Sequence, residues 1–241
     1  MGRYFGADDT DLMFVMLSNA HIAALVAAVV LLSLLVLGRR RLRRTASGER
    51  VRHGLAAGLV LSEVVLQIWH VANGEWAVDY GLPLQLCSVT LLLSAVMLWT
   101  RSYRLFECLY FAGIGGALQA LLTPNLAYTF PHLIYFHFFL AHIGIIAASL
   151  YMVLVCGFRP TLGSIGRTML YLNVYAVVVI IVNRLTGSNY MFLARKPSTA
   201  SLIDYLGPWP WYIGTMELVA LVIFALLYVP FARKRSETMK G

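Results

Sequence analysis

One thiol and two imidazoles are the groups in this chain best suited to covalent chemistry. Cys87 lies in the run Leu82-Pro83-Leu84-Gln85-Leu86-Cys87-Ser88, and His137 and His142 follow in a later apolar segment. An imidazole can take the proton of a thiol, and the thiolate can then attack an ester carbonyl to form a thioester. A second interpretation treats Cys87 as a small packing residue and the histidines as hydrogen-bonded core donors. The spacing alone leaves both interpretations open.

Proline is well tolerated in the first turn of a helix, so Pro83 predicts a helix that begins at Leu82. In that register Gln85 and Cys87 lie within the first two turns of a membrane-embedded helix. A polar amide in hydrocarbon is costly unless it has a partner or lines a wet cavity. The glutamine therefore predicts a polar environment around the thiol.

Three polar residues share one face of an earlier apolar segment. Glu63, Gln67 and His70 follow each other at spacings of four and three residues, which places them on one side of a helix. Ionisable side chains inside a membrane commonly mark proton or ion pathways, so Glu63, His70 and the later Glu217 favour a proton-coupled transporter as the non-enzymatic alternative. A metal site needs three or four ligands, and no His-x-x-x-His pair is present. We therefore predict no metal and no other cofactor.

The composition is that of an integral membrane protein. Of 241 residues, 60% are hydrophobic and 12% are charged, and the mean hydropathy is +0.75. A soluble domain of this size needs more polar surface. Because about 20 apolar residues span the hydrocarbon core as a helix, we predict an all-α fold, a single domain over residues 1–241 with seven transmembrane helices. The predicted spans are Val15–Gly38, Gly54–Gly74, Leu82–Trp99, Leu105–Leu122, Leu133–Cys156, Ile165–Val182 and Trp211–Phe231.

Positive charge gathers on one side of the predicted membrane. With these spans, fifteen Lys and Arg residues fall on one side and four on the other. The positive-inside rule makes the basic side cytoplasmic, with the N-terminus outside and the C-terminus inside. We expect the cluster Arg39–Arg52 to bind anionic lipid headgroups. Since the charge follows the membrane topology, we predict no nucleic-acid partner.

The polar residues within the spans are sorted by depth. Nine of them, from six spans, fall in the outer half or near the middle, whereas the inner halves are almost purely apolar in this topology. Packing residues would not sort in this way, so we predict a polar cavity that opens toward the outer leaflet. The three cysteines lie at different depths, which predicts free thiols. The nine polar residues are Gln67, His70, Gln85, Cys87, Gln119, His137, His142, Asn183 and Glu217.

The outer half also contains several recognisable motifs. The run Leu82–Ser88 occurs together with Phe138-Phe139-Leu140-Ala141-His142, Asn189-Tyr190-Met191-Phe192-Leu193, Lys196-Pro197 and Gly207-Pro208-Trp209-Pro210-Trp211. With these motifs nearly the whole chain resembles the YwaF family of bacterial membrane proteins. That family is similar to the animal TMEM-type acyltransferase that places polyunsaturated acyl chains on ether phospholipids. The resemblance implies a multi-pass protein of the bacterial plasma membrane that acts on membrane phospholipids.

The resemblance also implies the roles of individual residues. Cys87, in the motif L-P-L-x-L-C, matches the nucleophile, and His142, in the motif F-F-x-x-H, matches its base. Position 85 is glutamine here, where histidine is expected in many relatives. Judged by depth along the helices, His137 lies nearer the level of Cys87 and is the second choice for the base.

We therefore expect a membrane-embedded acyltransferase or transacylase that uses Cys87 and His142. The alternative is a non-catalytic transporter or binding protein for a small amphiphile, using Glu63, His70 and Glu217. In the enzyme, some polar residues would orient the donor or the oxyanion and others would line the outer mouth, where Lys196 would contact a phosphate. The expected substrate-binding residues are Gln67, His70, Gln85, Gln119, His137, Asn189, Tyr190, Lys196 and Glu217.

Overall fold

The computed structural model describes residues 2–6, 13–197 and 202–238, and the fold over these ranges is all-helical. Within them six helices are long and apolar enough to cross a membrane, and α4 (Leu86–Thr100) is apolar but shorter. The same ranges contain no strand beyond one isolated bridge between Met13 and Tyr128. The all-helical membrane character predicted from the sequence is confirmed. The long helices are α2 (Asn19–Arg44), α3 (Ala46–Ala72), the continuous α5–α6 helix (Tyr103–Leu122), α7 (Leu133–Leu154), α8 (Leu162–Thr186) and α9 (Trp211–Thr238).

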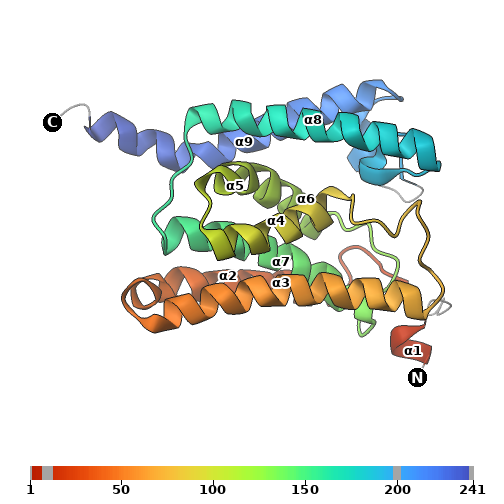
Figure 1. The fold of residues 1–241 in the computed structure, drawn as a ribbon, viewed down its shortest axis with the longest axis horizontal. Coiled ribbons are helices and arrows are strands. Elements are labelled where there is room, and N and C mark those ends of the chain that lie inside the picture. Colours follow the sequence, from red (N-terminus) through yellow and green to blue (C-terminus); the bar gives the residue numbers. More distant parts are fainter. Residues whose placement is uncertain (1, 7–12, 198–201, 239–241) are drawn as a thin grey trace.

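The helices are arranged in three layers (Figure 1). One outer layer holds α8 and α9, the middle holds α4 to α6, and α7 with α2 and α3 forms the other side. The tight turn between α2 and α3 lies at one end, which we call the hairpin end. The connections 73–85 and 187–197 lie at the opposite end, which we call the loop end, together with α1 (Gly2–Phe5).

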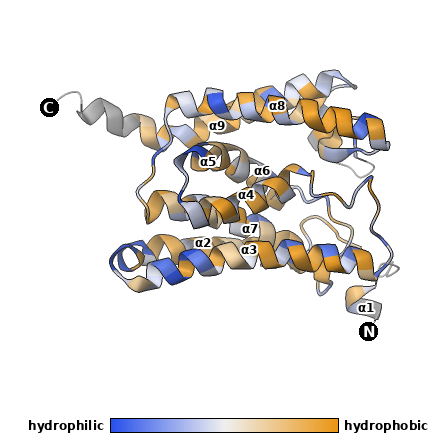
Figure 2. Cartoon of the chain, viewed as in Figure 1, coloured by the Kyte–Doolittle hydropathy of each residue, from blue (hydrophilic) through white to orange (hydrophobic). Residues whose placement is uncertain are grey.

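The core is concentrated in the middle layer and α7. Phe106, Phe111 and Met152 are fully buried there. In contrast, α2, α8 and α9 turn many apolar side chains outward, such as Leu37 and Leu185. Long apolar faces of this kind suit hydrocarbon rather than water. Figure 2 shows that hydrophilic residues of α2 and α3 gather at the hairpin end instead.

Capping residues, rather than hydropathy, set the ends of the helices. α2 begins at Asn19 instead of the predicted Val15, because Ser18 Oγ accepts a hydrogen bond from the N–H of His21 at 3.3 Å. Charged residues extend α2 and α3 beyond the apolar runs from which the spans were predicted: α2 ends at Arg44 instead of Gly38, and α3 begins at Ala46 instead of Gly54. The span predicted as Ile165–Val182 also becomes longer, Leu162–Thr186, whereas α3 and α7 end two residues early, at Ala72 instead of Gly74 and at Leu154 instead of Cys156.

The difference that matters most for the site is the start of α4. The predicted helix from Leu82, with Pro83 in its first turn, is wrong: the helix begins at Leu86, and Gln85 is its N-cap with φ −64° and ψ 144°. Pro83 lies in the non-helical connection before the helix. Cys87 is consequently the second residue of α4. Hydrogen bonds from distant residues hold this connection, and the local proline rule could not anticipate them.

The α5–α6 helix has a wider turn in its middle. Leu109–Gly113 form a π-helical segment between α5 (Tyr103–Cys108) and α6 (Ile114–Leu122), and all five residues are buried. The N–H of Ile114 bonds to the carbonyl of Leu109, and Ser149 of α7 donates to the same carbonyl at 3.2 Å. Segments of this kind are rare inside α-helices and often occur at functional sites. This one accommodates one extra residue in the turn between α5 and α6.

Candidate functional site

Cys87 lies at the open N-terminus of α4. The first helical hydrogen bond runs from the N–H of Val89 to the carbonyl of Gln85 at 3.1 Å, and no side chain caps the helix. The amides of Leu86, Cys87 and Ser88 therefore have no intrahelical partner. A helix N-terminus carries a partial positive charge that favours an anion. This position suits either a thiolate or an oxyanion formed next to it.

The connection that leads into α4 is bound by the loop that follows α8. The hydroxyl of the fully buried Tyr190 accepts from the N–H of Leu82 at 3.0 Å and donates to the carbonyl of Val78 at 2.7 Å. The N–H of Met191 donates to Oε1 of Gln85 at 3.0 Å. The structure thus brings together Gln85 and Tyr190, two of the predicted site residues. It also explains the open helix end, because the Gln85 oxygen is engaged elsewhere.

Residues of α8 fix the same connection from a second side. Tyr175 donates to the carbonyl of Leu84 at 2.9 Å. Asn183 accepts from the N–H of Tyr190 at 2.9 Å and donates to its carbonyl at 3.0 Å. Burial raises the pKa of Tyr190, so its hydroxyl keeps the proton that it donates. Met191 adopts φ 56°, a conformation that non-glycine residues keep only where their surroundings enforce it.

The polar face of α3 has two atoms without partners. Gln67 donates to Oε1 of Glu63 at 3.1 Å and accepts from the indole N–H of Trp76 at 3.2 Å. Among the described residues, Oε2 of Glu63 and Nδ1 of His70 are buried and have no hydrogen-bond partner. Buried polar atoms are nearly always paired, so an unpaired one points to a bound water, a ligand or a proton-transfer role.

The two histidines of α7 are held differently. Nδ1 of His137 contacts both the hydroxyl of Ser62, at 2.9 Å, and its carbonyl, at 3.1 Å. Nδ1 of His142 lies 2.6 Å from the carbonyl of Phe138. Since a carbonyl can only accept, Nδ1 of His142 carries the proton and the neutral ring keeps a lone pair on Nε2. The contact with Phe138 therefore fixes the ring and this tautomer of His142.

The packing of α3, α4 and α7 brings the predicted residues into two groups. Cys87 lies within electrostatic range of Glu63, and His137 lies within range of both His70 and His142. The hydrogen bonds of the described residues do not join Cys87 Sγ to a histidine. Nor do any three His, Cys, Asp or Glu side chains in the described ranges gather as metal ligands. Cys87, Cys108 and Cys156 are free thiols, as predicted.

Two predicted residues lie apart from these groups. Gln119 is exposed on α6 and donates to the hydroxyl of Thr123 at 3.4 Å. Glu217 belongs to α9, and Figure 1 places α9 in the layer opposite α3, which carries Glu63 and His70. The proton path predicted through Glu63, His70 and Glu217 would therefore have to cross the middle layer.

The remaining predicted residues belong to the loop after α8. Oδ1 of Asn189 accepts from the N–H of Arg195 at 3.0 Å, and its Nδ2 donates to the carbonyl of the same residue at 2.9 Å. Nζ of Lys196 donates to the carbonyl of Asp204 at 3.2 Å and lies 5.9 Å from the ring centre of Tyr212. Asn189 thus closes the loop, while Lys196 holds its charge at the loop end.

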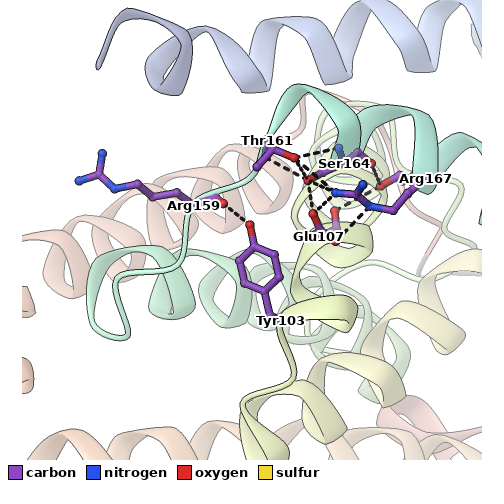
Figure 3. A network of polar contacts seen from close by, with 7 residues as sticks. Tyr103, Glu107, Arg159, Thr161, Ser164 and Arg167 are labelled. Atoms are coloured by element: carbon purple, nitrogen blue, oxygen red, sulfur yellow. Dashed lines mark hydrogen bonds and ion pairs between the residues drawn. The ribbon is translucent and has the colours of Figure 1, made fainter. Parts of the chain in front are cut away.

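A buried polar network occupies a part of the bundle that the sequence predicted to be apolar. Glu107 of α5, 7% exposed, accepts hydrogen bonds from Ser164 and Arg167 of α8 (Figure 3). Thr168 donates to the carbonyl of Glu107 at 3.2 Å. The prediction of almost purely apolar inner halves is therefore wrong. The sequence offered one signal, an acidic residue inside a span, but its partners lie about sixty residues away along the chain.

A polar cavity of about 300 Å³ lies at the hairpin end, between the α2–α3 turn, the C-terminal end of α7 and Arg101. The sequence predicted a polar cavity at the opposite end, beside Cys87, and that cavity stays a prediction. The hairpin cavity was not predicted, because its charged lining residues Arg43, Glu49 and Arg101 are of the kind that hydropathy patterns assign to the membrane surface.

Comparison with known proteins relates the chain to a family. The family model described as the TMEM164 family matches residues 16–228, a stretch that contains Cys87, both histidines of α7 and the loop after α8. No curated protein and no solved structure matches the chain.

Proposed function

The chain belongs to the TMEM164 family, and we propose that it transfers acyl chains between membrane phospholipids through a thioester at Cys87. The activity is the one implied by the resemblance to the YwaF family and its animal TMEM-type relative. The observation that carries the proposal is the position of Cys87 as the second residue of α4, at a helix N-terminus without a capping side chain. Such a terminus favours a thiolate and the oxyanion of acyl transfer alike.

The proposed reaction has two half-reactions. Cys87 gives its proton to a base, and its sulfur bonds to the ester carbonyl carbon of a donor phospholipid while the carbonyl oxygen becomes an oxyanion. First-turn amides of α4 donate to that oxyanion. The ester C–O bond then breaks, and the base returns the proton to the departing lysophospholipid. In the second half-reaction, an acceptor hydroxyl loses its proton to the base and attacks the thioester, and Cys87 recovers its proton.

His142 is the proposed base, with Nε2 as the accepting atom. The bond from its Nδ1 to the carbonyl of Phe138 supports this role, because it fixes the ring and its tautomer. Glu63 lies within electrostatic range of the thiol and has one unpaired oxygen. In the proposal this carboxyl group holds a water between the thiol and the imidazole. His137, whose Nδ1 is occupied by Ser62, stays the second choice for the base.

The other residues hold the site in place or bind the substrate. Gln85 and Tyr190 hold the connection before α4, since both are engaged by the protein itself. Lys196 is the proposed contact for a lipid phosphate at the loop end. We place the protein in a bacterial plasma membrane as one seven-helix domain, with the hairpin end in the cytoplasm and the N-terminus outside. The thiol then works in the outer leaflet.

The proposal is tested by trapping the thioester. The purified full chain in vesicles with a labelled phospholipid should carry the labelled acyl chain on Cys87, as peptide mass spectrometry would reveal. Cys87→Ala should abolish both the adduct and acyl exchange. Cys108→Ala, a matched change of another free thiol, should leave both unchanged. An acyl exchange rate that survives Cys87→Ala contradicts the proposal.

The second candidate function is a transporter or binding protein for a small amphiphile. It is favoured by the two unpaired buried atoms on one face of α3, Oε2 of Glu63 and Nδ1 of His70. The two candidates separate in one comparison. If the protein is a transporter, Glu63→Gln abolishes a pH-dependent uptake and Cys87→Ala leaves that uptake unchanged. If it is the enzyme, Cys87→Ala reduces acyl exchange more than Glu63→Gln does.

A further inference from the structure

The cavity at the hairpin end is built from four parts of the chain. It has a volume of about 300 Å³, and its polar lining comes from Arg43 and Thr45 of the α2–α3 turn, Glu49 of α3, Arg101 after α4 and Tyr151 of α7. These residues are far apart in sequence, so the cavity exists only in the folded bundle. It is separate from the Cys87 site, because the turn between α2 and α3 and the connection before α4 lie at opposite ends of the bundle (Figure 1).

The cavity carries an excess of positive charge. Arg101 pairs with Glu49, and the same carboxylate accepts from Arg52, which is 5% exposed and does not line the cavity. Arg43 lines the cavity and donates through Nε to the carbonyl of Leu154. Arg43, Arg52 and Arg101 with Glu49 therefore form a cluster with an excess of two positive charges.

Donors of these arginines remain available to a ligand. The terminal nitrogens of Arg43 have no hydrogen-bond partner among the described residues, and Arg101 uses one terminal nitrogen for Glu49. A guanidinium group presents five N–H donors in a planar fork that matches the oxygens of a phosphate. Each arginine can thus keep its present contact and still offer N–H groups to an anion.

The walls of the cavity are fixed. The buried hydroxyl of Tyr151 donates to the carbonyl of Gly48 at 2.8 Å, which ties α7 to the first turn of α3. A Cβ atom on Gly48 would lie 2.1 Å from the carbonyl oxygen of Leu42, so α2 and α3 approach as closely as a glycine allows. Arg52 donates to the carbonyls of Leu98 and Trp99 at the end of α4. The backbone around the cavity and the Arg52 side chain are therefore held in place before any ligand binds, and Arg43 and Arg101 each have one contact with the protein.

From this geometry we infer that the hairpin-end cavity binds a phosphate monoester. A monoester carries close to two negative charges at neutral pH, which matches the net charge of the cluster Arg43, Arg52, Arg101 and Glu49, whereas a phosphodiester carries one. The phosphate bridges Arg43 and Arg101 across the mouth of the cavity. Its source is either a lipid with a monoester headgroup, such as phosphatidate, or a soluble phosphate such as glycerol 3-phosphate. The anionic headgroup contact predicted for the whole cluster Arg39–Arg52 is thereby assigned to one cavity.

Native mass spectrometry of the full chain in neutral detergent tests this inference. The protein should retain phosphatidate in preference to phosphatidylglycerol, a diester of similar size. Arg43→Gln and Arg101→Gln should each weaken retention about tenfold, the effect of losing a charged hydrogen-bonded partner. Glu49→Gln should strengthen it, because Arg101 is released from its carboxylate. Cys87→Ala should change nothing, so the result is independent of the proposed acyl transfer.

Matched controls come from the same turn. Arg40 and Arg44 are exposed and do not line the cavity, so Arg40→Gln and Arg44→Gln remove the same charge without touching the site. Equal weakening by all four substitutions, or equal retention of the mono- and diester lipids, overturns the inference. Displacement of phosphatidate by glycerol 3-phosphate identifies a soluble ligand, and retention of the lipid alone identifies the headgroup; both results support the site. Helical circular dichroism of each variant confirms that it is folded.

Discussion

Buried polar groups are paired at the hairpin end of the bundle and are partly unpaired toward the loop end. At the hairpin end, Arg52 and Glu107 are buried, and both are bound by partners of opposite charge. Toward the loop end, Glu63 and His70 each keep a buried atom without a partner in the described part of the chain. A paired group that loses its partner destabilises a fold, whereas an unpaired group already costs stability where it stands. The comparison indicates that the buried charged groups at the hairpin end stabilise the fold, whereas those toward the loop end cost stability where they stand.

The strongest test of this difference removes the most buried guanidinium group. Arg52→Met leaves the carbonyls of Leu98 and Trp99 without this donor, and should lower the free energy of unfolding by about 3 kcal/mol. Unfolding in mixed detergent micelles, followed by circular dichroism, measures it. Arg50→Met, at an exposed position of the same helix, should stay within about 0.5 kcal/mol. Equal losses for the two variants would show that the buried guanidinium group of Arg52 contributes no more than an exposed one.

The close approach of α2 and α3 gives the next largest effect. A Cβ on Gly48 would meet the Leu42 carbonyl oxygen at 2.1 Å, so Gly48→Ala should cost about 2–3 kcal/mol by forcing the hairpin apart. At Gly58, on the same helix, a Cβ meets nothing within 4 Å. Gly58→Ala should therefore stabilise the helix by about 0.5–1 kcal/mol. Thermal unfolding of the two variants should shift in opposite directions, and a shift of the same sign would be a contradiction.

Two buried carboxyl groups, Glu107 and Glu63, allow the two ends to be compared by the same substitution. Glu107→Gln weakens the contacts to Ser164 and Arg167, and should destabilise the protein by about 1–2 kcal/mol. Glu63→Gln removes an acid that has one unpaired oxygen, so stability should be unchanged or rise by up to about 1 kcal/mol. Acyl exchange should fall only for Glu63→Gln. A loss of stability at Glu63 as large as that at Glu107 would show that both ends are organised alike.

The smallest effect on stability concerns the connection before α4. Tyr190→Phe removes the hydroxyl that bonds to Leu82 and Val78, which should cost about 1 kcal/mol. Acyl exchange should fall further, about tenfold or more, because a small displacement of Cys87 disturbs the reacting geometry. The control is Tyr171→Phe, on the exposed face of α8. If both variants keep full activity, the connection does not position the thiol.

Much of the fold could be predicted from the sequence, because long apolar runs and the distribution of arginines are local signals. The helical membrane character and most spans follow from these patterns. The start of α4 could not be predicted, since Pro83 suits a helix locally and the contacts that exclude it come from Tyr190 and Met191. Their separation from the connection is about one hundred residues.

The candidate site was predictable in its residue types and less so in its pairings. Gln85 and Tyr190 were both chosen from the sequence, and the structure places them at the same connection. The network of Glu107 with Arg167 was missed, because a lone acid inside a span does not reveal its partner. The roles of Cys87 and His142 stay predictions. Their helices pack together, and the thioester experiment tests the chemistry.

The wide turn at Leu109–Gly113 also bears on how the gene tolerates insertion and deletion. A π-helical turn holds one residue more than the α-helical turn that it replaces, so deleting one residue within it would restore a regular helix and leave the rest facing nearly the same way. Gly115 and Gly116 would then keep their places against Phe224 and Leu86. A one-residue deletion in the regular part of the helix would instead rotate everything after it by about 100°. This stretch is therefore where the helix can lose a codon and still meet the same neighbours.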